Sequence, residues 1–97
     1  MQNQKIFELK PEFVDEIMEE LELGILYISE KFGVCIHLCA CGCGLKTVMD
    51  LKPKWKDGWT LTNKDGKITL RPSIGNFTGE NPYHAHYFIT ENKIEWL

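Results

Sequence analysis

Long apolar runs are missing from this 97-residue chain, since none approaches the roughly 20 residues that cross a bilayer. The first ten residues, MQNQKIFELK, lack the apolar centre of a secretory signal peptide. The basic stripe of a nucleic-acid-binding protein is also missing, because 14 acidic residues outnumber 11 basic ones and the net charge is −3. We therefore expect a cytoplasmic protein that binds neither membranes nor nucleic acid. The length suits a single domain, residues 1–97.

The acidic residues are unevenly distributed. Half of the 14 lie in one stretch near the N-terminus: Glu8, Glu12, Asp15, Glu16, Glu19, Glu20 and Glu22. Within the same stretch, apolar residues recur at helical spacing: Phe13, Val14, Ile17, Met18 and Leu21. Pro11 suits a first helical turn and Gly24 a C-terminal stop, so the pattern predicts a helix over 11–23. The acids then form its solvated face, or alternatively a docking surface for a basic partner.

The remainder of the chain has the pattern of short strands joined by turns. Residues 24–29 and 34–40 flank a turn-like EKFG, and residues 46–51 follow as a further strand. Asp65-Gly66 is a strong hairpin signal between residues 59–63 and 67–72, and residues 85–89 and 93–97 form another pair. Residues 72–82 have no regular pattern, which predicts a long functional loop. The predicted fold is α+β: a mainly antiparallel sheet of six to seven short strands and one N-terminal helix.

All four cysteines of the chain lie within CIHLCACGCG, residues 35–44. A disulfide clasp, a structural metal site and one wall of an active site are the alternatives. Disulfides are rare in reducing compartments, and residues two apart on an extended chain lie near the limit for bridging. Gly42 and Gly44 favour a turn, which would present Cys41 and Cys43 at the end of a strand.

A second cluster, His84-x-His86, can complete a metal site with these thiols. Residues two apart on an extended segment point to the same side, so both imidazoles can approach one ion. Cysteine and histidine together suit Zn²⁺ better than Ca²⁺ or Mg²⁺. The predicted ligands are Cys41, Cys43, His84 and His86, with Cys39 as the next candidate. Cys35 is expected to be a small buried residue, and His37 is expected to be packed or surface-exposed rather than a ligand. A pair of surface histidines is the alternative interpretation of the second cluster.

The number of bound thiols decides what such a metal site does. Two cysteines with both histidines close the coordination sphere, whereas one cysteine leaves a position for reacting water. A catalytic site also needs a proton shuttle, for which Glu80 is the nearest carboxylate. Ser73 can donate a hydrogen bond to an oxyanion. The plainer interpretations are a solvated loop glutamate and a turn-forming serine.

The chain resembles a family of small bacterial proteins associated with operons that encode ubiquitin-like proteins and their activating and conjugating enzymes. CxCGCG, PSI and the terminal H-x-H motif carry the resemblance, which covers about residues 24–97. It implies a cysteine, glutamate, histidine, histidine metal signature, which falls on one CACGC cysteine, Glu80, His84 and His86. Some members have a cysteine near the position of Tyr83 and retain only the second histidine, so the ligand set varies.

The leading hypothesis is a zinc-dependent peptidase, a hydrolase that processes or deconjugates a ubiquitin-like protein at its C-terminal tail. Glu80 would act as acid and base and Ser73 would stabilise the oxyanion, in chemistry comparable to JAB-type deubiquitinases. The alternative is a non-catalytic adaptor with structural zinc in the same pathway, in contact with its activating and conjugating enzymes. A third option, another zinc hydrolase or a deaminase, lacks the H-x-E and P-C-x-x-C motifs.

Overall fold

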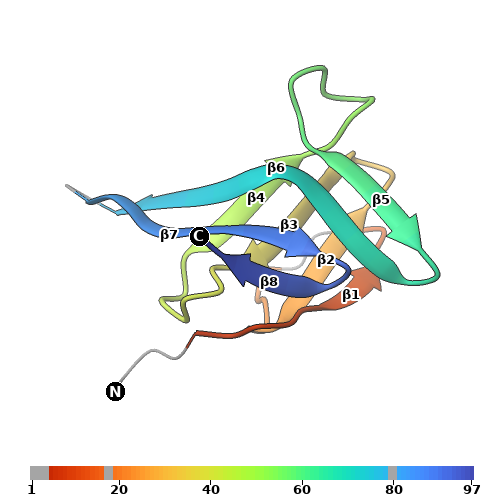
Figure 1. Cartoon of the computed structure of the whole chain (residues 1–97). Coiled ribbons are helices and arrows are strands. Elements are labelled where there is room, and N and C mark those ends of the chain that lie inside the picture. Colours follow the sequence, from red (N-terminus) through yellow and green to blue (C-terminus); the bar gives the residue numbers. More distant parts are fainter. Residues whose placement is uncertain (1–4, 17–18, 79–80) are drawn as a thin grey trace.

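The residues that the structure describes form eight strands in two four-stranded sheets (Figure 1). The structure, a computed structural model, describes residues 5–16, 19–78 and 81–97, and for residues 76–78 and 81–84 it describes the backbone alone. The strands are β1 (Lys10–Phe13), β2 (Ile25–Ser29), β3 (Val34–Leu38), β4 (Lys46–Asp50), β5 (Thr60–Lys64), β6 (Lys67–Thr78), β7 (Asn81–Thr90) and β8 (Lys93–Trp96).

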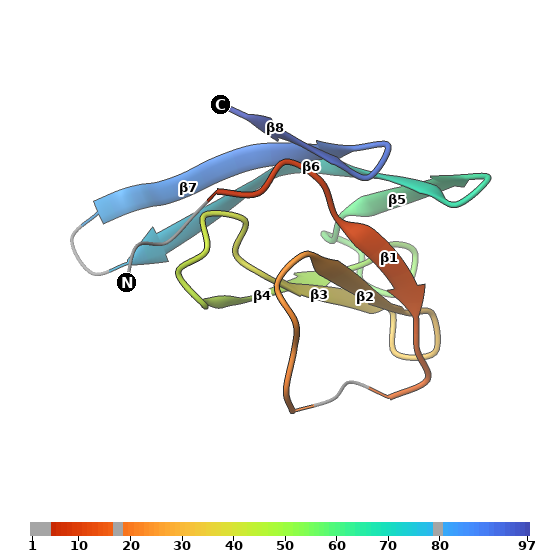
Figure 2. The same ribbon diagram turned by 90° about the horizontal axis from the view of Figure 1, so that it is seen from below.

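Each sheet follows the order of the chain. The first sheet has the order β1-β2-β3-β4 and the second β5-β6-β7-β8. The β1–β2 pair is parallel, and the other neighbouring pairs are antiparallel. Figure 2 shows the two sheets as separate layers, with the loop between β3 and β4 lying below the β6–β7 hairpin. This arrangement brings residues 39–45 close to the second sheet.

A single hydrophobic core joins the two layers. The first sheet and its loops contribute Leu26, Ile28, Cys35, Cys39, Met49 and Leu51, and the second sheet contributes Ile68, Leu70, Ile74, Ala85, Tyr87, Ile89 and Ile94. Along β4, β8 and the described side chains of β6 and β7, buried side chains alternate with more exposed ones, as expected for sheets that bury one face. The core therefore fixes which face of each strand is available for function.

The predicted α+β class is wrong, because the described residues form an all-β fold without a helix. The first three residues of the expected helix, 11–13, belong to β1 instead, and Lys10 N and Val14 N donate to Gly24 O and Ile28 O respectively. The expected apolar face does not reach the core: Phe13 is 49% exposed. Ile17 and Met18 lie outside the described residues. Backbone pairing with β2 thus outweighs the 3.6-residue periodicity.

The described residues contain no helix of the length and hydrophobicity needed to cross a membrane.

The predicted hairpins are confirmed. β2 pairs with β3, β5 with β6 and β7 with β8, each in antiparallel register. Asp65 and Gly66 have φ values of 53° and 86°, the left-handed conformations that a tight two-residue hairpin turn requires. Local turn chemistry therefore predicted these connections correctly.

The predicted loop over residues 72–82 is the second error, since β6 continues to Thr78 and β7 begins at Asn81. The β6–β7 register shifts between Leu70 and Ile74 and again between Asn76 and Thr78. Such bulges accommodate residues that do not fit regular pairing, including proline, which has no backbone N–H to donate. Pro72 lies within the first shift. The irregular pattern therefore marks a bulged hairpin (Figure 2).

Candidate active site and cysteine cluster

A serine and a histidine meet on the β6–β7 hairpin. Ser73 Oγ lies 2.9 Å from His86 Nε2, within hydrogen-bonding distance. His86 is paired with Gly75, two residues beyond Ser73, so the two side chains are diagonal neighbours on one face of the hairpin. Gly75 has no side chain to separate them. The hairpin therefore places a hydroxyl beside an imidazole nitrogen, the pairing by which a base activates a serine nucleophile.

The other serine of the chain cannot take this role. The sequence contains two serines, Ser29 and Ser73. Ser29 is fully buried and its Oγ accepts a hydrogen bond from Phe32 N, whereas Ser73 is partly exposed. Ser73 is thus the serine that an external substrate can reach.

His37 is a packing residue, the first of the two alternatives that the sequence left open for it. It lies fully buried between the sheets, with Nε2 2.6 Å from the Tyr87 hydroxyl. Burial lowers the pKa of its imidazole to about 4, so the ring is neutral in the folded protein near pH 7. Its Nδ1 has no hydrogen-bond partner among the described residues. His37 therefore has no access to a substrate at the Ser73–His86 pair.

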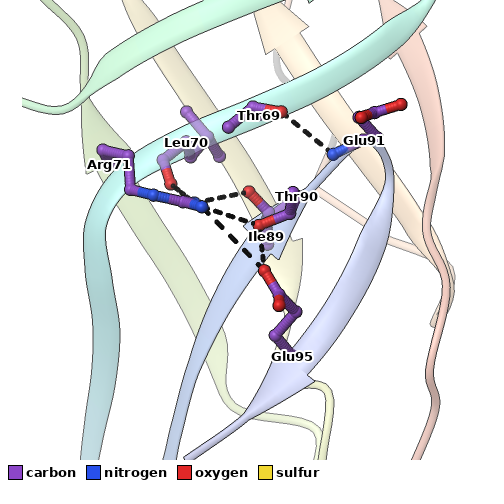
Figure 3. A network of polar contacts seen from close by, with 7 residues as sticks. All are labelled: Thr69, Leu70, Arg71, Ile89, Thr90, Glu91 and Glu95. Carbon is purple, nitrogen blue, oxygen red and sulfur yellow. Dashed lines mark hydrogen bonds and ion pairs between the residues drawn. The ribbon is translucent and has the colours of Figure 1, made fainter.

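Arg71, two residues before Ser73, bonds to residues on both strands of the β6–β7 hairpin (Figure 3). Its guanidinium donates hydrogen bonds to acceptors on both β6 and β7: Leu70 O at 2.9 Å, Ile89 O at 3.3 Å and Thr90 Oγ1 at 2.9 Å. The guanidinium carbon also lies 4.5 Å from the centre of the Phe88 ring, and a terminal nitrogen lies 3.9 Å from the Glu95 carboxylate. The segment that carries Ser73 is thus tied to β7 and β8.

Three of the four cysteines converge in the loop that follows β3. The Sγ atoms of Cys39, Cys41 and Cys43 all lie within 4.8 Å of one another, and those of Cys39 and Cys41 are 3.4 Å apart. None of the four cysteines is in a disulfide. Three thiols this close could hold a metal ion, and the donor set suits a soft ion.

The three thiols differ in environment. Cys39 is buried, Cys41 half-buried and Cys43 exposed. Burial and hydrogen bonds with the other thiols raise the pKa of Cys41 to about 12. Burial also raises the pKa of Cys43, but hydrogen bonds from the Leu45 backbone and from the other two thiols outweigh it, so the pKa is lowered overall. Cys43 is therefore expected to ionise before Cys41.

The cysteine cluster and the Ser73–His86 pair lie on opposite faces of β7. Tyr87 points into the core, where its hydroxyl accepts a hydrogen bond from Ala40 N at 3.4 Å and also bonds the Cys39 side chain. Side chains alternate along a strand, so the adjacent His86 points away from the core. The two groups of residues therefore lie on opposite sides of one strand, although Tyr87 and His86 are adjacent in sequence.

The predicted site residues fall into three groups. Cys41 and Cys43 lie together, joined by Cys39, the lower-ranked candidate. His86 lies beside Ser73, which sequence reasoning had assigned to the oxyanion. Glu80 and the side chain of His84 lie outside what the structure describes, so their roles stay predictions. The scarcity of serine is the sequence signal that could have drawn attention to Ser73.

Comparison with known proteins identifies a family. A family model described as "Bacterial ubiquitination-like system serine protease (BubE)" matches residues 13–97. No curated protein and no solved structure matches the chain. The match confirms the expected association with ubiquitin-like conjugation. It also corrects the prediction of a zinc-dependent metallopeptidase, because the family is described as a serine protease.

Proposed function

Because the chain belongs to the BubE family of bacterial ubiquitination-like system serine proteases, we propose that it is a serine protease with Ser73 as nucleophile and His86 as general base. The observation that carries this proposal is the 2.9 Å contact between Ser73 Oγ and His86 Nε2. Ser73 is one of two serines in the chain, and the other is fully buried.

The reaction follows from this pair. Ser73 Oγ attacks the carbonyl carbon of the scissile bond while its proton passes to His86 Nε2. His86 then returns the proton to the leaving amine, which departs and leaves an acyl ester on Ser73. Water, deprotonated by the same imidazole, hydrolyses the ester and regenerates the serine. In this proposal Ser73 is the attacking group, whereas the sequence predicted that it donates a hydrogen bond to the oxyanion.

The proposed substrate is the extended C-terminal tail of a ubiquitin-like protein. β5 pairs with β6 only as far as Arg71, so in the described pairings the edge of residues 72–78 that faces away from β7 has no neighbouring strand. An extended peptide can add to such an edge through main-chain hydrogen bonds. A tail bound there would pass beside Ser73. The activating and conjugating enzymes of the same system are further proposed partners.

The predicted zinc ion and its predicted ligands have different roles in this proposal. Zn²⁺ is retained as a structural ion at the cysteine cluster, so residues 1–97 are still proposed to be one zinc-binding domain. His86 is assigned to Ser73 rather than to the metal, and His84 and Glu80 carry no assigned step.

Replacement of Ser73 tests the activity. Ser73→Ala should abolish cleavage of the ubiquitin-like precursor of the same system, followed by mass spectrometry, because no other serine can reach the bond. Thr62→Ala is the matched control, since it removes a hydroxyl from an exposed strand position on β5. It should cleave at the wild-type rate.

A fluorophosphonate probe gives a readout that needs no substrate. The probe should modify Ser73 in the wild-type protein, as mapped by peptide mass spectrometry, and modification should fall sharply in His86→Ala because the serine loses its base. Cleavage by Ser73→Ala at the wild-type rate would refute Ser73 as the nucleophile. No cleavage and no labelling of Ser73 in the wild-type protein would favour the alternative of a non-catalytic adaptor.

A further inference from the structure

The loop after β3 is shaped so that alternate side chains converge. Gly42 and Gly44 have φ values of 87° and 86°, a left-handed conformation that residues with a side chain rarely adopt. Gly42 N donates to Cys39 O, and Cys39 N donates to Leu45 O, which closes the loop across its base. An extended chain would hold these cysteines well apart. The two glycines instead turn the three thiols toward a common point.

The spacing of the thiols matches a metal site. Ligands at about 2.3 Å around a tetrahedral ion lie about 3.8 Å from one another. The three Sγ atoms lie within 4.8 Å of one another, and the Cys39–Cys41 separation is 3.4 Å. A disulfide requires about 2.0 Å between the sulfur atoms. The cluster therefore has the dimensions of a coordination site and not of a disulfide.

The environment of the cluster favours an ion that stabilises structure. Cys39 is fully buried and belongs to the core, while Cys43 opens to solvent, so an ion can enter from outside and reach a ligand anchored inside. The loop also connects the two sheets, because Ala40 O accepts from Ile6 N and Ala40 N donates to Tyr87. An ion that holds this loop in place would also hold its contact with Tyr87 on β7.

We propose that Cys39, Cys41 and Cys43 bind one thiophilic divalent ion of the zinc class, on the face of β7 opposite to Ser73 and His86. The ion holds the 39–45 loop against Tyr87 and takes no part in bond cleavage. His86, which lies beside Ser73, is not a ligand in this proposal. The site is independent of the proposed protease activity, so each can fail without the other.

Metal analysis of the whole chain tests this site. Protein purified after expression in zinc-supplemented medium should contain one zinc ion per chain. Replacement by Co²⁺ should give a thiolate-to-cobalt charge-transfer band with the intensity of three thiolates. This measurement needs no variant, and an intensity corresponding to fewer thiolates, or the absence of bound metal, would overturn the proposal.

Matched variants identify the ligands. Cys43→Ser should lose the ion, because it removes one of the three thiolate ligands. Cys43 is the ligand chosen because it is the most exposed of the three, so its replacement disturbs the core least. Cys35→Ala should retain it, since this fourth cysteine lies on β3 outside the cluster. Ser73→Ala and His86→Ala should also retain it. Loss of metal in His86→Ala would instead support a mixed cysteine and histidine site and would contradict the proposal.

A stability measurement separates an ion that holds the loop from one that merely occupies it. A chelator should lower the Tm of the wild-type protein and leave the Tm of Cys43→Ser unchanged, because only the former has an ion to lose. An equal Tm of the wild-type protein with and without the chelator would refute the structural role.

Discussion

At the scale of single residues, Tyr87 connects the features on which function depends. Its ring is fully buried, packs edge-on against Trp96 at 5.1 Å between ring centres and lies beside His86 in the chain. Its hydroxyl lies within hydrogen-bonding distance of His37 Nε2 and Ala40 N. Burial raises the pKa of this phenol above its ordinary value, so it remains a neutral hydrogen-bonding group.

Tyr87→Phe should therefore destabilise the protein by about 1–3 kcal/mol, because it leaves the buried His37 Nε2 and Ala40 N without their shared partner. Urea unfolding measures the free-energy change. Tyr27→Phe is the control: its hydroxyl accepts from Glu22 N in a partly buried contact, and water can replace it. The expected change for the control is about 1 kcal/mol or less. Equal losses in the two variants would contradict the importance assigned to the buried hydroxyl.

At the scale of elements, the β6–β7 hairpin carries the proposed chemistry. Ser73 lies within one register shift and Gly75 lies opposite His86 after it, so the bulge sets where the two side chains meet. Arg71 holds the strands together immediately before this point, through hydrogen bonds to Ile89 O and Thr90 Oγ1 on β7 (Figure 3). Its guanidinium also lies over the ring of Phe88 on β7. The arginine is a positioning residue in this arrangement.

Arg71→Met should reduce the rate of substrate cleavage several-fold and lower stability by about 1 kcal/mol, because it removes the hydrogen bonds that fix β6 against β7. Fluorophosphonate labelling of Ser73 should slow in parallel. Lys67→Met is the matched control on the same strand, since its ion pair with Glu91 is exposed and spans 4.0 Å. Such a pair contributes little, so the control should behave as wild type. An equal fall in the cleavage rate of Lys67→Met would show that the loss of any cationic side chain from β6 slows cleavage, and would contradict a specific positioning role for Arg71.

At the scale of the whole molecule, the two sheets share one core and should unfold together. Leu26 on the first sheet and Leu70 on the second are both fully buried members of the same cluster. Leu26→Ala and Leu70→Ala should each destabilise the protein by about 2–5 kcal/mol. The calorimetric and van't Hoff enthalpies should remain equal in both variants.

Val48→Ala is the control for these core variants. Val48 lies on β4 and is 52% exposed, so its truncation should change the free energy of unfolding by about 0.5 kcal/mol or less. Two separate transitions in either leucine variant would show that the sheets are independent and would contradict the single core.

Local features of the sequence determined much of the β-structure. Asp65-Gly66 predicted the β5–β6 turn, because few residue pairs adopt left-handed conformations so readily. The glycines among the cysteines likewise predicted a turn after β3, with Cys41 and Cys43 at the end of the strand. These features succeed because the chemistry that decides them lies within a few residues.

Tertiary structure decided the rest, because it depends on partners distant in the chain. Residues 11–23 have helical periodicity, but pairing with β2 forms β1 and leaves Phe13 largely exposed. The bulged pairing of β6 with β7 brings Ser73 to His86, and the alternation of side chains along β7 puts His86 and the cysteine loop on opposite faces. Residue types alone suggested that histidine and cysteine share one metal. Strand register is what separates them, because a shift of one residue sends a side chain to the other face of a sheet.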